Sequence, residues 1–191
     1  MKSILQSRAA TATIAAVASV GLFMGGMAFA GGGGDPAVKF SGGSQVQSKV
    51  ATSGLGFDVS GYNIWRSVPD ARLTVNVPAG ATRLITARFS AESDCSVDAG
   101  VSQDWCGMRI MAKKAGGQAM ELYPRVGHEY AFDSDDSGQE RWESNSFNRS
   151  IKLQSGSWDI WVQAQNYASA KAVGGFFIDD FHFEVEVSKA S

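Results

Sequence analysis

Apolar and polar residues alternate along much of the chain after residue 70, and alternation with a period of two predicts β-strands. Residues 72–77 alternate, Pro78-Ala79-Gly80 follows as a turn signal, and residues 84–90 alternate again. Two alternating runs joined by a short turn are typical of a hairpin. We therefore expect residues 72–77 and 84–90 to pair with each other.

The C-terminal part carries the strongest alternation, over residues 158–165 and 175–187. In the second run Phe181, Phe183, Val185 and Val187 share one face, and His182, Glu184 and Glu186 share the other. One apolar and one polar face is typical of a strand in an antiparallel sheet. Strands recur at about ten-residue spacing without a helical period, which predicts an all-β antiparallel β-sandwich.

The N-terminus has the charge order of a secretory signal peptide. Lys2 and Arg8 precede an uncharged run that ends in Ala28-Phe29-Ala30, a small-residue cleavage site. A retained membrane anchor is the alternative, because the run is long enough to cross a bilayer, which takes about 20 residues. Its Ala- and Gly-rich composition favours cleavage, so we predict a secreted or periplasmic protein without membrane contact.

These patterns divide the chain into three parts. Residues 1–30 are predicted to be a signal peptide, residues 31–53 a Gly/Ser-rich flexible segment, and residues 54–191 the β-sandwich domain. A single domain of this length can bury a sizeable core.

Cys95 and Cys106 are the only two cysteines in the chain. An even number of cysteines in an exported protein indicates a disulfide. A zinc site is the alternative, but two cysteines without a neighbouring histidine do not complete a zinc shell. We therefore predict that the two cysteines are bonded to each other.

The distribution of charged residues and the absence of catalytic motifs argue against several functional classes for this chain. The chain has 17 basic and 19 acidic residues without basic clusters, which argues against nucleic acid and anionic membranes as partners. It contains no G-x-S-x-G, H-E-x-x-H or phosphate-binding glycine motif. We interpret His182, which lies beside Asp180 and Glu184, as a member of a cross-strand pair. A non-enzymatic protein is favoured, while a glycosidase-type carboxylate pair stays open because no motif marks one.

Four segments together carry a resemblance: residues 85–95, residues 105–110, Trp158 to Gln163 and the Phe-rich C-terminal run. They resemble uncharacterised secreted bacterial β-sandwich proteins and the jelly-roll layout of tumour-necrosis-factor and complement-type globular heads, over roughly residues 70–187. The resemblance implies a jelly-roll fold and a homo-oligomer, with a trimer as the expected form. It implies no catalytic residues.

Two acidic groups are candidate calcium sites, since calcium takes six to eight oxygen ligands. The first is Asp133, Asp135 and Asp136, with Glu140 nearby, and the second is Asp94, Asp98 and Asp104 around the disulfide loop. Neither group has the spacing of an EF-hand loop, so we expect solvated loops and no cofactor. Calcium is the only cofactor that the sequence suggests, and it would fit a calcium-dependent adhesion protein.

Residues 158–165 supply the other candidate site. Alternation turns Ile160, Val162 and Ala164 toward the core and leaves one outward set, Asp159, Trp161, Gln163 and Gln165. An exposed indole beside polar groups suits a sugar, whereas tryptophan is also enriched in the cores of subunit interfaces. We favour the subunit contact. The sequence thus predicts an extracellular structural or ligand-binding domain, with a carbohydrate-binding module or carbohydrate-active enzyme as the alternative.

Overall fold

A computed structural model of the chain describes residues 39–96, 105–125, 130–134, 141–167 and 175–190. All regular structure in these residues is β-strand. The strands are β1 (Gly42–Ser53), β2 (Phe57–Asp58), β3 (Arg66–Ser96), β4 (Trp105–Lys114), β5 (Ala119–Glu121), β6 (Ala131–Asp133), β7 (Glu143–Tyr167) and β8 (Gly175–Ala190). Among the described residues there is no helix that could span a membrane.

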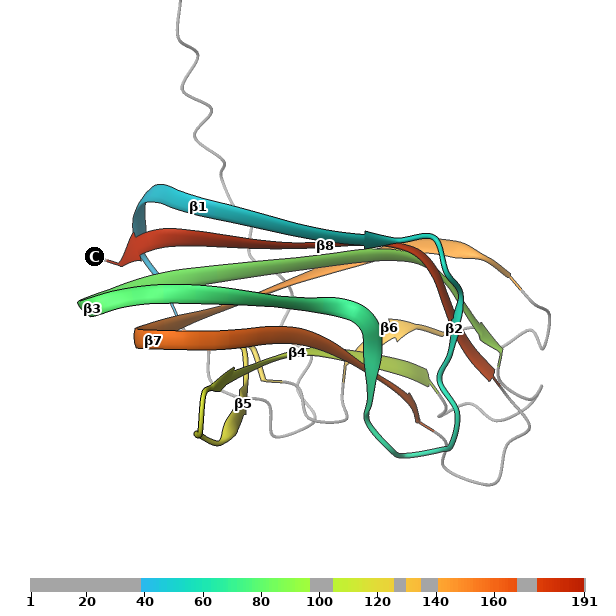
Figure 1. The fold of residues 1–191 in the computed structure, drawn as a ribbon. Coiled ribbons are helices and arrows are strands. Elements are labelled where there is room, and N and C mark those ends of the chain that lie inside the picture. Colours follow the sequence, from blue (N-terminus) through green and yellow to red (C-terminus); the bar gives the residue numbers. More distant parts are fainter. Residues whose placement is uncertain (1–38, 97–104, 126–129, 135–140, 168–174, 191) are drawn as a thin grey trace, which may run out of the picture. The chain divides into compact units, whose positions relative to one another are not determined.

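The long strands β3 and β7 bend together and pass from one layer to a second layer (Figure 1). The first sheet contains β1, β8, residues 82–96 of β3 and residues 143–154 of β7. The second sheet contains residues 66–77 of β3, residues 156–167 of β7, and β4 with β5 and β6 at its edge. All of these pairings are antiparallel, and their order is that of a jelly roll. The predicted all-β antiparallel, jelly-roll-like sandwich is confirmed.

The predicted hairpin is wrong. Residues 72–77 pair with residues 156–161 of β7, and residues 84–90 pair with a different part of β7 and with β8. Gly80, with φ 71°, and Gly156, with φ 140°, lie where the two strands bend. A side chain at Gly156 would also collide with the aliphatic part of Lys114. The turn signal at Pro78-Ala79-Gly80 therefore marks a corner between layers, because β7 bends at the same place and keeps both arms paired.

Most residues of the segment 31–53, which we expected to be flexible, belong to the strand β1. From Ser48 to Ser53 it pairs with Glu186 to Phe181 of β8 without interruption. Its residues are largely exposed, with Lys49, Ala51 and Ser53 half-buried. An edge strand of this kind lacks an apolar face, so its composition resembles that of a loop. From Gly42 onward the segment belongs to the first sheet.

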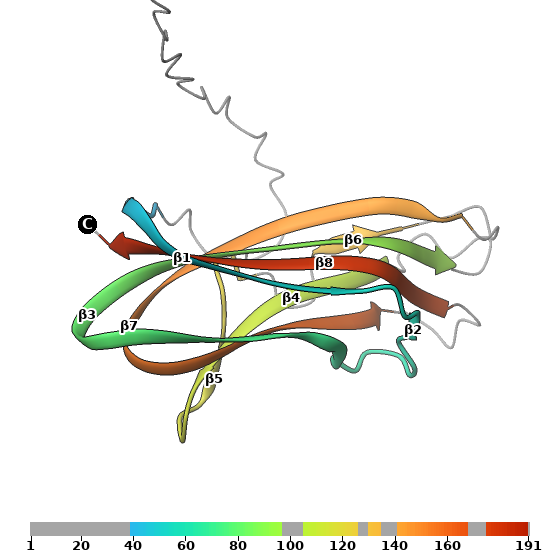
Figure 2. The same cartoon turned by 45° about the horizontal axis from the view of Figure 1, so that its top comes forward.

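Aromatic rings fill the space between the layers at one end of the sandwich. The Phe89 ring is fully buried and lies 5.5 Å from the Phe181 ring, measured between centroids. Three further rings surround it, those of Phe132, Phe147 and Phe183. The apolar face predicted for residues 181–187 is buried as expected, and the polar residues between are exposed or half-buried. β8 lies between β1 and β3 in the first sheet (Figure 2).

The predicted disulfide between Cys95 and Cys106 is present, with an S–S distance of 2.09 Å. Both residues are fully buried. Cys95 lies near the end of β3 in the first sheet, and Cys106 lies at the start of β4 in the second sheet. The disulfide thus joins the two layers at the end of the sandwich opposite to the corner in β3 and β7.

Candidate functional site

Polar side chains cross the outer face of the first sheet in two rows. Each row takes one residue from β7, one from β3 and one from β8, held opposite one another by the strand register. The first row is Asn148, Arg88 and Glu184, and the second is Ser146, Ser90 and His182. Since these residues alternate with the buried residues of the same strands, the packed core fixes their positions.

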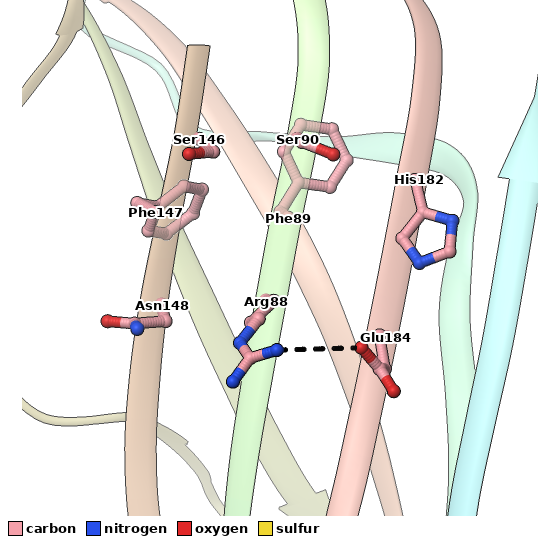
Figure 3. A pocket seen from close by; sticks show the side chains of 8 residues that line it. All are labelled: Arg88, Phe89, Ser90, Ser146, Phe147, Asn148, His182 and Glu184. Carbon is pink, nitrogen blue, oxygen red and sulfur yellow. Dashed lines mark ion pairs between the residues drawn. The ribbon is translucent and has the colours of Figure 1, made fainter. Parts of the chain in front are cut away.

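These six residues line a depression of about 580 Å³ (Figure 3). Phe89 and Phe147 contribute to its floor, with their rings buried in the core. A second depression of about 380 Å³ shares Ser90 and Ser146 with the first and continues along β3 to Glu92. Its lining also includes Ser144 and Asp180. We refer to the two depressions together as the polar groove.

Within the polar groove, the Glu184 carboxylate is held by a hydrogen bond and an ion pair, whereas most of the other polar side chains form no hydrogen bond with the described residues. Glu184 Oε1 accepts a hydrogen bond of 2.9 Å from Ser48 Oγ on β1. Its other oxygen lies 4.0 Å from Nη1 of Arg88. The Arg88 side chain is 56 % exposed and that of Glu184 is 23 % exposed, so solvent weakens this ion pair. Within the described part of the chain, no side-chain hydrogen bond engages Ser90, Ser146, Asn148 or His182.

A β-bulge shapes the far end of the polar groove. Between Ser90 and Glu92 the register with β8 shifts, so that β8 contains one more residue than β3 over this stretch. Asp180 lies in the bulge with a positive φ of 44°. Bulges redirect side chains, and an aspartate tolerates this backbone conformation better than most residues do. The bulge therefore places Asp180 at the rim of the groove.

The outward set predicted from residues 158–165 lies on the outer face of the second sheet, where two of its members are held by hydrogen bonds. Asp159 accepts a hydrogen bond of 2.7 Å from the Thr74 hydroxyl. Gln163 Oε1 accepts one of 2.8 Å from Nε of Arg109. Burial lowers the pKa of Arg109, and the negative charge of Glu121 opposes this effect.

The other two members of this set are buried. Trp161 is 7 % exposed and Gln165 is 1 % exposed. The guanidinium carbon of Arg72 lies 4.9 Å from the centroid of the Trp161 ring, so Arg72 covers the ring from a neighbouring strand. Trp161 is thus covered within the chain, and a subunit contact or a sugar site at this set of residues stays a prediction.

Only one residue of the first predicted calcium site is described. Asp133 is buried and accepts a hydrogen bond of 2.6 Å from Ser93 Oγ. Burial raises the pKa of Asp133, the Ser93 bond lowers it, and the charges of Glu143 and Asp94 raise it further. Asp135 and Asp136 lie outside the described residues, as do Glu140, Asp98 and Asp104.

The described residues contain no group of three or more His, Cys, Asp or Glu side chains that could hold a metal ion. Asp94, from the second acidic set, is buried, and its Oδ1 accepts a hydrogen bond of 3.3 Å from the backbone N–H of Arg141. That neither acidic set binds calcium stays a prediction.

No protein-family model matches the chain, and no curated protein sequence is significantly similar to it. Among solved structures, the chain resembles one from infectious bursal disease virus, Gx strain, with 12% identity, a TM-score of 0.37, and coverage of 80% of this chain and 38% of that one. It also resembles the carbohydrate-binding module CBM6cm-2 of Cellvibrio mixtus lichenase 5A, solved with cellotriose, with 16% identity, a TM-score of 0.27, and coverage of 78% and 92%. A third similarity is to the CBM22-1 xylan-binding domain of Paenibacillus barcinonensis Xyn10C, with 11% identity, a TM-score of 0.29, and coverage of 81% and 100%. These similarities concern the β-sandwich, and no functional residue is transferred from them.

Proposed function

We propose that the protein is an exported, non-enzymatic β-sandwich domain that binds a glycan in the polar groove. The observation that carries this proposal is a depression of about 580 Å³ in which the side chains of Ser90, Ser146, Asn148 and His182 form no hydrogen bond with the described residues. This volume lies within the range of ligand sites, about 300–1,000 Å³. The lining residues stand on strands of a packed sheet, which keeps a binding site preorganised.

The chemistry of the groove fits a ligand rich in hydroxyl groups. Arg88 donates hydrogen bonds, Asn148 both donates and accepts, and the serine hydroxyls do the same. Trp142 is 52% exposed and lies two residues before Ser144, which lines the far end of the groove. An exposed indole offers the apolar surface that sugar rings favour.

The spacing of Glu184 and Glu92 argues against hydrolysis by this pair of carboxylates. Glu184 lies in the row of Arg88, whereas Glu92 lies four residues further along β3. At about 3.3 Å per residue, this separation is on the order of 13 Å. The carboxylate pairs of glycoside hydrolases are about 5–9.5 Å apart.

Export of the chain is part of the proposal. The signal-peptide pattern at residues 1–30 supports it, and so does the Cys95–Cys106 disulfide, since disulfides persist in oxidising compartments. Homo-oligomerisation, with a trimer as the expected form, stays a prediction that light scattering tests.

Isothermal titration calorimetry of the mature protein with β-linked oligosaccharides tests the proposal. Ser146→Trp, which fills the groove, should weaken binding at least tenfold. Asn76→Trp is the matched control, because Asn76 is an exposed strand residue of the second sheet. Equal binding by both variants, or no binding of any oligosaccharide by the wild type, would contradict the proposal.

A further inference from the structure

The two ends of the polar groove differ in charge, and from this difference we infer that the glycan carries a primary amine. The inference rests on the proposed function and adds the class of sugar. The amine would bind at the end of the groove formed by Glu92 and Asp180. An oligosaccharide of amino sugars with free amino groups has this chemistry.

The charged residues at the first end of the groove balance each other. Arg88 and Glu184 face each other across β3 and β8, and Ser48 holds the Glu184 carboxylate. A ligand at this end therefore meets hydrogen-bonding groups without a large net charge.

The second end is negative. Glu92 and Asp180 are exposed, and neither carboxylate forms an ion pair or a side-chain hydrogen bond with the described residues. No lysine or arginine is among the residues that line this depression. The two carboxylates come from neighbouring strands, since Glu92 pairs with Asp179. The bulge brings Asp180 to the same depression, so both acids can face one cationic group.

An ammonium group fits this end better than a metal ion does. Calcium requires six to eight oxygen ligands, and two carboxylates provide at most four. An ammonium group has three N–H donors, which two carboxylates and a serine hydroxyl can accept. Exposed ion pairs are weak and sensitive to salt. We therefore expect the amine to tighten binding by roughly three- to tenfold.

Three β-1,4-linked tetrasaccharides of equal length separate amine recognition from glycan recognition: those of glucosamine, N-acetylglucosamine and glucose. We would measure their dissociation constants by calorimetry at mildly acidic pH, where the glucosamine amine is protonated, at low and at high salt. The wild type should bind the glucosamine tetramer roughly three- to tenfold more tightly than the neutral tetramers at low salt, and high salt should abolish the difference.

Variants assign this preference to the two carboxylates. In the double variant Glu92→Gln/Asp180→Asn, the preference should be lost, so that the dissociation constants for the three tetramers become equal. Asparagine also tolerates the positive φ at position 180. Glu186→Gln is the matched control, because Glu186 stands on the same sheet face two residues beyond Glu184 on β8, and it should retain the preference.

Equal affinity of the wild type for all three tetramers would overturn the amine inference and leave the proposed function standing. A preference that persists in the double variant would overturn it as well. If the wild type binds none of the tetramers, the proposed function itself fails, and the inference fails with it.

Discussion

Replacing Cys95 and Cys106 together by alanine will destabilise the domain by an amount that the structure allows us to estimate. The disulfide joins the two layers at the end opposite to the corner in β3 and β7. The cysteines are fully buried, so alanine is preferred to serine, which would bury hydroxyl groups.

The expected loss in the free energy of unfolding follows from the length of the loop that the disulfide closes. The two cysteines are 11 positions apart, and closing a loop of this size in the unfolded chain corresponds to about 3 kcal/mol of stability in the chain-entropy description. For a domain of about 160 residues, each 1 kcal/mol shifts the Tm by about 2–4 °C. The double variant should therefore melt roughly 6–12 °C below the oxidised wild type.

Urea unfolding followed by tryptophan fluorescence and by circular dichroism measures this loss. Fully reduced wild type is the control, because it lacks the bond and keeps the cysteines. It should lose a similar free energy of unfolding. A double variant that loses less than about 1 kcal/mol would refute the conclusion that this bond constrains the unfolded chain.

Four further predictions follow from other parts of the structure. Phe89→Ala should lower the free energy of unfolding by about 3–5 kcal/mol, measured by urea denaturation, because it removes the central ring of the aromatic cluster. Asp133 has a raised pKa in the folded protein, so the folded state binds more protons than the unfolded state once the pH rises above about 4. The free energy of unfolding of the wild type should therefore fall relative to that of Asp133→Asn as pH increases, and parallel pH profiles would contradict this. Arg72→Ala should increase acrylamide quenching of Trp161, with Trp161→Phe as the reference, because the arginine covers the ring. Intact mass of the exported protein should show Gly31 as the first residue, and a retained leader would disprove cleavage.

Period-two alternation was sufficient to predict much of the fold. It assigned the buried and exposed faces of residues 181–187, and the cysteine count led to the disulfide. Alternation cannot tell a turn from a corner, since both interrupt the pattern in the same way. The hairpin prediction failed at Pro78-Ala79-Gly80 for this reason. The sequence left the stretch to about Ser53 open between a weak strand and a flexible tail, because an edge strand with polar side chains on both faces carries no clear alternation.

The candidate site depended on information that alternation does not contain. The pattern places Arg88 and His182 on the outer faces of their own strands, but only the pairing register brings both beside Ser90 and Ser146. Alternation was also insufficient to predict the burial of Trp161. Alternation assigned its face, whereas the arginine that covers it comes from another strand.

Amide chemical-shift mapping can locate the glycan on the two sheets. We would record spectra of ¹⁵N-labelled mature protein during titration with the glucosamine tetrasaccharide. The largest shifts should fall on β3, β7 and β8 around Ser90, Ser146 and His182, and the amides on the outer face of the second sheet around Trp161 should stay unchanged. Saturable shifts centred on Trp161, or no saturable shifts at all, would contradict the proposed binding in the polar groove.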